Sequence, residues 1–554
     1  MTLTIESIGP APIDERAEQV MVPMRDGTRL ATDLYLPPHS RPVPAVLVRL
    51  PYDKCGRYTF MPALAPHLLA RGYALVVQDV RGKFRSEGET MPYLHEVTDG
   101  YDTIDWIAAQ AWSDGIVGMF GDSYYGWTQW AAVASGHPAL RAIVPRMSSA
   151  DLASIRLATR WDSGIVPLYA ADYLAHHWVD QRTHEYQVDW SARPLASVFD
   201  DHFRQIGRRS AGLDQLLRQA RPIDPFPAGH PFDQPEIPAL HSVGWFDNIA
   251  PDSMRDYMTL QSRGRTLQYL AADSTDHENY QLADVPAELD HDQHDEALQR
   301  LIPRYLGPAL DFFDAFLKGG PSESIRRVRW HQGHGDWHAA DRWPPPGATP
   351  LRLYLDDASR ATRDADGGLL TPLAPAAARL GRWTHDPHEL VPSTVTNPFG
   401  YLLERPDERQ VHDRPDVATF TSEAFDAGFD LAGPVEARLS VATTGPSMHV
   451  HLKLCDVAPD GIAYMLVRGQ VLVPHPDLDR PVSVYLGHTG YRLAPGHRLR
   501  LHIASSDFPL YLPHSGDDQN PWRFVTGTLN QQTLRTGGSH PSYLSAHVLG
   551  GPPL

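Results

Sequence analysis

One short stretch, Gly-Asp-Ser-Tyr-Tyr-Gly at residues 121 to 126, constrains the possible folds of this chain more than any other. An apolar run (116 to 120) precedes it, and a segment typical of a helix (127 to 135) follows it. In α/β-hydrolases a strand ends at such a point and turns sharply into a helix, which exposes a serine hydroxyl at the carboxyl edge of the sheet. We therefore predict that Ser123 is a nucleophile. The usual signature has its second glycine two residues after the serine, where this chain has Tyr125. A serine flanked by glycines is also common in surface turns, which is the alternative interpretation.

Length and charge limit the class of protein. A chain of 554 residues is too long for one hydrophobic core, so we expect two or three domains. The 49 basic residues against 67 acidic ones give a net charge of -18, which disfavours nucleic acid as a partner. No apolar run has the length of a membrane span, and with only Cys55 and Cys455 a disulfide framework is not expected. We expect a cytoplasmic protein without a membrane partner, and a homo-oligomer stays open.

Buried-type strands alternate with helical segments in the first part of the chain. Residues 20 to 36 alternate around Asp26-Gly27, which predicts a hairpin. The continuous apolar runs that we interpret as strands cover residues 45–50, 74–77, 116–120, 140–144, 238–244 and 267–272. This alternation predicts a mainly parallel sheet covered by helices on both faces, as in the α/β-hydrolase fold.

Two changes of pattern suggest the domain boundaries. Residues 149 to 231 are amphipathic and rich in aromatic side chains, which indicates a helical cap inserted between residues 1–148 and 232–345 of the α/β domain. From residue 346 to 554 short segments mostly alternate with period two, which predicts an all-β sandwich or jelly roll. Within this part, residues 357 to 380 are predicted to be a long connection.

A serine needs a histidine base, and that base needs a carboxylate that fixes its tautomer. In α/β-hydrolases these residues follow in the order Ser, Asp, His. Asp247 and His277 each follow a buried-type strand, so both are expected at the same sheet edge as Ser123. Asp247 could instead cap a helix and His277 could be a solvated loop residue. Asp252 and Asp276 are the substitutes for the acid.

Two hydrogen-bond donors must also face the oxyanion of the tetrahedral intermediate. The backbone N–H of Tyr124, directly after the serine, is the first candidate. The loop at residues 51 to 54 lacks the glycines that usually supply the second donor, so the phenolic hydroxyl of Tyr52 is a candidate. A tyrosine packed at a strand end is the alternative interpretation of Tyr52.

Five motifs occur in order along nearly the whole chain: Arg49-Leu50-Pro51-Tyr52, Gln78-Asp79-Val80-Arg81-Gly82 with Ser86-Glu87-Gly88, Gly121-Asp122-Ser123-Tyr124-Tyr125-Gly126, Gly244-Trp245-Phe246-Asp247, and Ser505-Ser506-Asp507-Phe508-Pro509. With them the chain resembles the cocaine esterase / α-amino-acid ester hydrolase / X-Pro dipeptidyl-peptidase (CocE/NonD) family of serine hydrolases. The resemblance implies an α/β-hydrolase domain, a helical cap and a C-terminal jelly roll.

The resemblance also implies roles for individual residues. It carries over Ser123, Asp247 and His277 as the catalytic triad, and Tyr52 with Tyr124 as the oxyanion hole. Relatives usually have Gly-Pro-Trp shortly before the histidine, where this chain has the different sequence of residues 272 to 276. We interpret the Asp79-Arg81-Gly82 motif as structural, with an ion pair that supports the turn at Ser123.

Relatives that hydrolyse α-amino-acid esters bind the substrate ammonium with carboxylates two and three residues after the triad aspartate. This chain has Ile249 and Ala250 there, and an ammonium without a counter-charge is disfavoured in an apolar pocket. We therefore expect a carboxylic ester whose acyl group has no free α-amine. Five aromatic residues could line the acyl pocket: Trp161, Tyr169, Tyr173 and Trp178 of the cap, with Phe246 beside Asp247. The alternative is that the cap aromatics belong to the core of the cap.

Several alternatives remain. The same triad would serve an amidase, an acylase or an X-Pro-type dipeptidyl-peptidase, and the β-sandwich could instead serve a non-catalytic binding protein. Two segments dense in His and Asp, 290–295 and 331–338, lack the helix-borne His-Glu-x-x-His pattern. We expect no metal and no cofactor.

Overall fold

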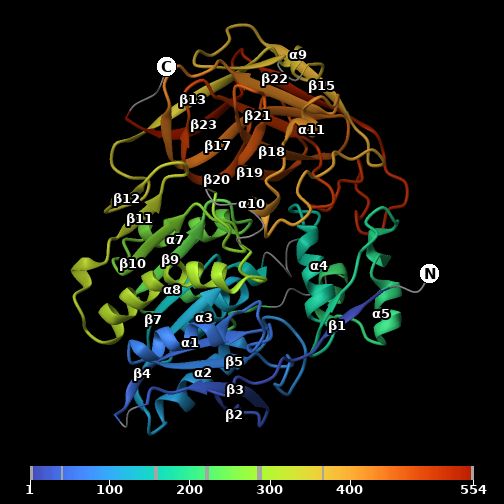
Figure 1. Cartoon of the computed structure of the whole chain (residues 1–554). Coiled ribbons are helices and arrows are strands. Elements are labelled where there is room, and N and C mark those ends of the chain that lie inside the picture. The colour runs from blue at the N-terminus through green and yellow to red at the C-terminus, as the bar shows by residue number, and fades with distance from the viewer. Residues whose placement is uncertain are drawn as a thin grey trace.

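Two large β-sheets, one in each half of the chain, dominate the architecture of the computed structural model (Figure 1). The structure describes residues 4–38, 41–154, 160–218, 224–282, 290–364 and 367–550.

The first sheet has, within the described residues, ten strands in the order β12-β11-β10-β9-β7-β6-β4-β5-β3-β2. The inner pairs from β5 to β11 are parallel, whereas β2, β3 and β12 pair antiparallel at the two edges. The predicted hairpin and the mainly parallel sheet are therefore confirmed. The strands are β2 (Glu18–Pro23), β3 (Arg29–Tyr35), β4 (Val43–Leu50), β5 (Ala74–Asp79), β6 (Ser113–Asp122), β7 (Leu140–Arg146), β9 (Ala239–Gly244), β10 (Gln268–Asp273), β11 (Val328–His331) and β12 (Trp337–Ala340).

Helices cover both faces of this sheet because its inner strands are apolar on both sides. All eight residues of β4 are buried, and successive side chains point to opposite faces. Val46 and Val48 share a core with α1 and α8, whereas Ala45 and Leu47 share another with α2 and α7. The helix α3 contributes to both cores. These helices are α1 (Met61–Ala70), α2 (Glu96–Ala108), α3 (Ser123–Ser135), α7 (Ala250–Ser262) and α8 (Asp295–Leu317).

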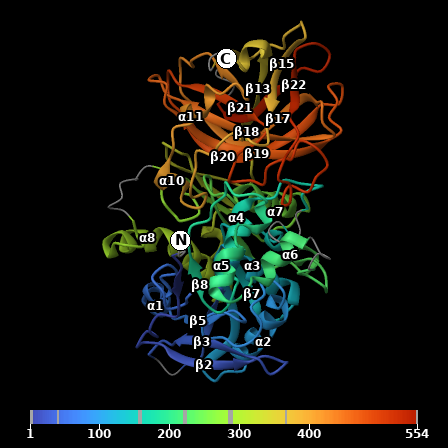
Figure 2. The ribbon, with the colours of Figure 1, turned by 90° about the vertical axis from the view of Figure 1, so that its right-hand side faces the viewer.

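Between β7 and β9 the chain forms a separate helical layer (Figure 2). It contains α4 (Leu168–His177), α5 (Asp200–Ile206) and α6 (Ala211–Arg218), and its short strand β8 (Thr183–Glu185) pairs with β1 (Glu6–Ile8). The ammonium of Lys83 donates hydrogen bonds to the carbonyl oxygens of His177, Asp180 and Arg182. This buried lysine therefore attaches the end of α4 to the α/β domain.

The second half of the chain is an all-β domain. Its strands follow the path β15-β22-β17-β23-β13-β14-β16-β21-β18-β19, and β20 pairs with β17. Of the pairs described, β14 with β16 is parallel and the others are antiparallel. The strands are β13 (Ala348–Asp356), β14 (Gly368–Thr371), β15 (Arg379–His385), β16 (Val417–Ser422), β17 (Phe429–Thr443), β18 (Ser447–Val457), β19 (Ala463–Pro474), β20 (Val482–Leu493), β21 (Arg498–Ala504), β22 (Asn530–Thr536) and β23 (Tyr543–Leu549).

The prediction of a long connection at residues 357 to 380 is wrong. This stretch contains the short helix α9 (Ala358–Ala361) and the strand β14. Ala358 and Ala361 are buried in the core of the β domain, so two small apolar residues allow a helical turn to pack where the composition suggested a loop.

One hydrophobic core spans the junction of the two halves. Trp245, Trp330 and Trp343 pack together and share this core with the strands of the β domain. The Trp343 indole bonds to His488 of β20 at 2.9 Å. Among the described residues, the structure has no helix long and apolar enough to cross a membrane.

Candidate active site

Ser123 lies at the junction of β6 and α3, in a left-handed backbone conformation with φ 51°. Such a conformation is strained for a residue other than glycine. Gly121 before it has φ 141°, and a Cβ there would lie 2.0 Å from the ring of Tyr125. A Cβ on Gly126 would lie 2.5 Å from that of Ser148. The turn therefore needs glycine at 121 and 126, and the ring of Tyr125 packs over Gly121.

Asp247 and His277 are joined by a hydrogen bond. Asp247 follows β9 and His277 follows β10, and the two strands are parallel neighbours. The distance from His277 Nδ1 to Asp247 Oδ1 is 2.8 Å, and the Asp247 side chain is completely buried. Because a carboxylate only accepts hydrogen bonds, Nδ1 carries the proton and Nε2 carries the lone pair of the neutral ring.

The two substitute acids have other partners. Asp276 accepts hydrogen bonds from the backbone N–H groups of Leu402 and Tyr280, so it fastens the His277 loop to the β domain. Asp252 forms an ion pair with Arg255 in the same helix.

A polar cluster joins the loop of Ser123 to the loop of His277. Arg146, at the end of β7, donates to Asp122 at 2.9 Å and to the side-chain oxygen of Asn279 at 2.8 Å. Asn279 also donates to Asp122 at 3.5 Å. Since Asp122 precedes Ser123 and Asn279 follows His277 by two residues, this cluster connects the turn and the histidine loop directly.

The two predicted oxyanion donors belong to the first turn of α3 and to the loop after β4. The backbone N–H of Tyr124 is in the first turn of α3, where no preceding carbonyl of the helix can accept it. Tyr52 follows β4, and its ring packs edge-on against that of Tyr125 with centroids 6.1 Å apart. Tyr52 is therefore next to the turn, at the same edge of the sheet.

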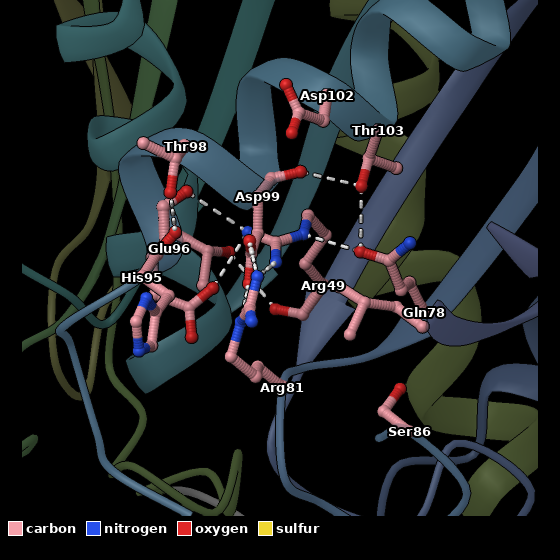
Figure 3. A network of polar contacts seen from close by, with 12 residues as sticks. Arg49, Gln78, Arg81, Ser86, His95, Glu96, Thr98, Asp99, Asp102 and Thr103 are labelled. Atoms are coloured by element: carbon pink, nitrogen blue, oxygen red, sulfur yellow. Dashed lines mark hydrogen bonds and ion pairs between the residues drawn. The ribbon is translucent and has the colours of Figure 1, made fainter. Parts of the chain in front are cut away.

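A buried ion-pair network around Arg49, Arg81, Glu96 and Asp99 (Figure 3) contacts the residue that follows Ser123. The Tyr124 hydroxyl donates to Glu96 at 2.9 Å, and Glu96 pairs with Arg49 at 2.7 Å. Arg81 belongs to the same network through Asp99, at 2.7 Å.

The two charged residues of the Asp79-Arg81-Gly82 motif form separate ion pairs, and that of Arg81 belongs to the network that contacts the turn. Asp79 pairs with Lys54 at 2.7 Å, whereas Arg81 pairs with Asp99 and Asp26. The ion pair between Arg49 and Glu96 was not predicted from the sequence, although Arg49 is part of one of the five motifs. The position of Arg49 directly before the Leu-Pro-Tyr motif was the available signal.

Of the five aromatic residues predicted to line the acyl pocket, Trp178 is fully buried and packs against Tyr124. The other four lie in three different places. Tyr169 and Phe246 line one cavity of about 370 Å³ beside Asp247. Tyr173 lies against Tyr52, with ring centroids 6.5 Å apart. Trp161 lines a separate cavity of about 240 Å³ with His449 and His514 of the β domain. Only Tyr169 and Phe246 of the four thus share a cavity.

The β domain contributes a residue that sequence reasoning missed. The Phe399 ring packs on His277 with centroids 5.1 Å apart, and the Phe399 carbonyl accepts the N–H of Glu278 at 3.2 Å. Phe399 also packs against Tyr169 of the cap. Because it lies 122 residues after His277, no local motif pointed to it.

The two segments dense in His and Asp serve other contacts. His331 bonds to Ser274, His338 stacks on Trp330, and Asp290 accepts the hydroxyl of Tyr280. Over the described part of the chain, the structure contains no group of three or more His, Cys, Asp or Glu side chains that could hold a metal ion.

Family models match both halves of the chain. Residues 26–279 match the X-Pro dipeptidyl-peptidase (S15 family) model, and residues 322–545 match the X-Pro dipeptidyl-peptidase C-terminal non-catalytic domain. The chain is 30% identical to the cocaine esterase of Rhodococcus sp. (strain MB1 Bresler), over 96% of this chain and 98% of that protein. It is 25% identical to a putative serine esterase of Mycobacterium bovis, over 89% and 90% of the two chains.

Solved structures agree with these matches. An α-amino acid ester hydrolase superposes with a TM-score of 0.79 at 25% identity, over 97% of this chain and 98% of that one. A CocE/NonD family hydrolase from Staphylococcus aureus has a TM-score of 0.65 at 17% identity, over 99% and 97% of the chains, which bears on the fold alone.

Proposed function

This chain belongs to the cocaine esterase / α-amino-acid ester hydrolase / X-Pro dipeptidyl-peptidase family of serine hydrolases, and we propose that it cleaves a carboxylic ester of a small molecule through an acyl-enzyme. The observation that carries this proposal is the 2.8 Å hydrogen bond between His277 and the buried Asp247, on the same sheet edge as the strained Ser123. A serine hydroxyl becomes a nucleophile when such a pair removes its proton.

The first half of the reaction forms the acyl-enzyme. Nε2 of His277 takes the proton of the Ser123 hydroxyl while Oγ forms a bond to the ester carbonyl carbon. The carbonyl oxygen becomes an anion that accepts hydrogen bonds from the Tyr124 N–H and the Tyr52 hydroxyl. The intermediate then collapses, the bond to the alkoxy oxygen breaks, and His277 gives its proton to that oxygen.

The second half releases the acid. Water takes the place of the alcohol, His277 removes one of its protons, and the oxygen attacks the acyl carbon. Asp247 stays ionised throughout, because it stabilises the imidazolium that forms in both halves. The second tetrahedral intermediate then collapses, the bond between the acyl carbon and Ser123 Oγ breaks, and His277 returns its proton to Oγ. The products are an alcohol and a carboxylic acid.

We propose an acyl group without a free α-amine. Ile249 and Ala250 are buried apolar residues at the positions where an ammonium would need carboxylates. Comparing a phenylglycine ester with its deaminated analogue tests this preference. Faster turnover of the phenylglycine ester would overturn it.

An amidase, an acylase or an X-Pro-type dipeptidyl-peptidase is the second candidate, and the X-Pro dipeptidyl-peptidase matches support it. The same triad can expel an amine as well as an alcohol. Paired p-nitrophenyl esters and p-nitroanilides with varied acyl groups separate the two activities. We expect each ester to be hydrolysed faster than its matched anilide. The ratio of the two enzymatic rates should exceed the ratio of the two uncatalysed rates.

We further propose that the all-β domain, residues 346–554, is a jelly roll. The α/β-hydrolase domain would then comprise residues 1–148 and 232–345, with the cap at 149–231. The helical layer between β7 and β9 and the strand order of the β domain support this division.

The nucleophile is tested with Ser123→Ala. This variant should fold normally, lose covalent labelling by a fluorophosphonate and lose esterase activity, whereas Ser262→Ala at the exposed end of α7 should keep both. Labelling that persists in Ser123→Ala would refute the assignment. A wild-type protein that is neither labelled nor active on any ester or anilide would favour the remaining alternative, a non-catalytic binding protein.

A further inference from the structure

A cavity of about 370 Å³ lies where the α/β domain, the cap and the β domain meet. Its wall includes Tyr169 of the cap, Phe246 and Asn248 around Asp247, and Arg468 of β19. Ligand pockets of proteins begin at about this size. Several of its polar groups have no hydrogen-bond partner in the described protein, and these groups define what the cavity can hold.

Arg468 is the first such group. Its Nη1 atom is inaccessible to solvent and has no hydrogen-bond partner, and across the described residues no carboxylate lies within 4.0 Å of its side-chain nitrogens. Its neighbour Asp507 pairs instead with Lys453 at 3.4 Å. Asp507 contributes a favourable charge interaction to Arg468, but it does not accept the Nη1 hydrogens. A buried N–H group without an acceptor is unfavourable, so Nη1 calls for an acceptor in the cavity, and an anion satisfies it best.

Asn248 is the second group. Both its side-chain oxygen and its side-chain nitrogen are buried without a partner. It lies directly before the start of α7, whose first residues, from Ala250 to Asp252, also line the cavity. The positive end of the helix dipole adds to the field that favours an anion here.

The other charges on the cavity wall are already paired. Asp252 pairs with Arg255, and Asp247 pairs with His277. The rest of the wall is largely aromatic, with the side chains of Tyr169, Trp245, Phe246, Tyr485 and Tyr511. The cavity therefore combines one guanidinium nitrogen and one side-chain amide that lack hydrogen-bond partners with aromatic walls.

We infer that this cavity binds a small aromatic carboxylic acid, whose carboxylate accepts hydrogen bonds from Arg468 and from the side-chain amide of Asn248. This site goes beyond the proposed reaction, because none of its binding groups is assigned to the triad or the oxyanion hole. Such an acid could be the product of ester cleavage or a separate ligand.

Direct binding of benzoate to the full chain tests the site without turnover. Isothermal titration calorimetry should show saturable binding of benzoate and of phenylacetate, whereas the neutral benzyl alcohol should bind at least tenfold more weakly. No saturable benzoate binding by the folded wild-type protein would overturn the inference. This outcome is distinct from a failure of the proposed function, which fluorophosphonate labelling reports separately.

Three variants locate the bound carboxylate. Arg468→Gln should weaken benzoate binding at least tenfold, and Asn248→Asp should weaken it similarly because a second carboxylate repels the ligand. Arg468→Lys keeps the positive charge but not the forked geometry of the guanidinium. Its affinity for benzoate should lie between those of wild type and Arg468→Gln. Arg480→Gln at the exposed surface is the control. Benzoate binding unchanged in both Arg468→Gln and Asn248→Asp would place the acid elsewhere and overturn the inference.

Steady-state inhibition distinguishes the two sources of the acid. If the cavity receives the acyl group, benzoate should raise KM without changing kcat, and Arg468→Gln should relieve this inhibition. If it receives a separate ligand, benzoate should change kcat and Arg468→Gln should abolish that change. Inhibition that does not respond to Arg468→Gln would contradict the site in either role.

Discussion

Tyr52 is a residue whose position alone suggests a chemical role. It lies in the loop that follows β4, and its ring packs edge-on against the rings of Tyr125 and Tyr173. A structural tyrosine and an oxyanion donor would occupy this place equally well, so only removal of the hydroxyl separates them.

We expect Tyr52→Phe to lower kcat for ester hydrolysis by about 10²–10³ while the melting temperature changes little, because one hydrogen bond to the oxyanion is lost. Stopped-flow kinetics with a p-nitrophenyl ester measures this. Tyr354→Phe in the β domain is the matched control. A rate within a factor of three of wild type would mean that the second donor lies elsewhere.

Glu278 is a further residue that can affect the chemistry, because it directly follows His277. Burial raises the pKa of its carboxyl to about 7, against the opposing effect of His277. Below pH 7 the carboxyl is neutral; above pH 7 it carries a negative charge that favours the imidazolium of His277.

Glu278→Gln should therefore lower kcat/KM at pH 8 by about three- to tenfold and leave it nearly unchanged at pH 5.5, since a neighbouring charge shifts a pKa by up to about one unit. The pH profile of kcat/KM, measured between pH 5 and 9, checks this. The exposed Glu323→Gln is the control. Parallel profiles for Glu278→Gln and wild type would show that this carboxyl does not titrate near His277.

At the scale of elements, the cap shares a hydrophobic core with the α/β domain, and Lys83 adds buried polar contacts to it. Lys83 donates to three carbonyl oxygens at the end of α4, at 2.5, 3.0 and 2.9 Å, and its ammonium lies 5.7 Å from the centre of the Trp178 ring. The Trp178 ring also packs against that of Tyr124, beside Ser123. The position of the cap and the geometry of the turn are thus linked through Lys83 and Trp178.

Lys83→Met should lower the free energy of unfolding by about 3 kcal/mol, because three buried carbonyl oxygens lose their donor. Limited proteolysis should then cut first within residues 149 to 231, ahead of the α/β and β domains. Lys318→Met, which changes a partly exposed lysine, is the control. Its free energy of unfolding in urea and its cleavage pattern should be the same as those of wild type. Unchanged cleavage of Lys83→Met would show that other contacts hold the cap.

At the scale of the whole molecule, the two halves are not independent units. The core around Trp245 and Trp343 includes strands of both, and Asp276 of the histidine loop bonds to the backbone of Leu402. The cap reaches the β domain as well, through the hydrogen bond from Leu168 N to Leu510 O at 2.9 Å. The β domain therefore supports both the loop of Asp247 and the loop of His277.

A chain truncated after residue 345 should fail to give a soluble, labelled enzyme, because a large apolar core would be exposed to water. Expression of residues 1–345, followed by circular dichroism and fluorophosphonate labelling, checks this expectation. The full chain should lose activity and tryptophan fluorescence in one coincident transition. A soluble fragment that labels at Ser123 would show that the first half folds and assembles its site alone.

The sequence by itself was sufficient for the features that depend on local pattern. Continuous apolar runs predicted the inner strands because a parallel sheet is buried on both faces, and the glycines around Ser123 predicted the turn because only they allow its backbone. The order of Ser123, Asp247 and His277 along these strands predicted which edge would carry them, since parallel strands end on the same side.

Only the tertiary structure decided which side chains meet. The sequence favours Asp247 as the acid and leaves Asp252 and Asp276 as substitutes. The pairing of β9 with β10 is what brings Asp247 within 2.8 Å of His277. Phe399 and Arg468 come from the β domain, more than a hundred residues after Asp247 and His277. Their places depend on how two domains pack, and long-range packing leaves no periodic or local signal in a sequence.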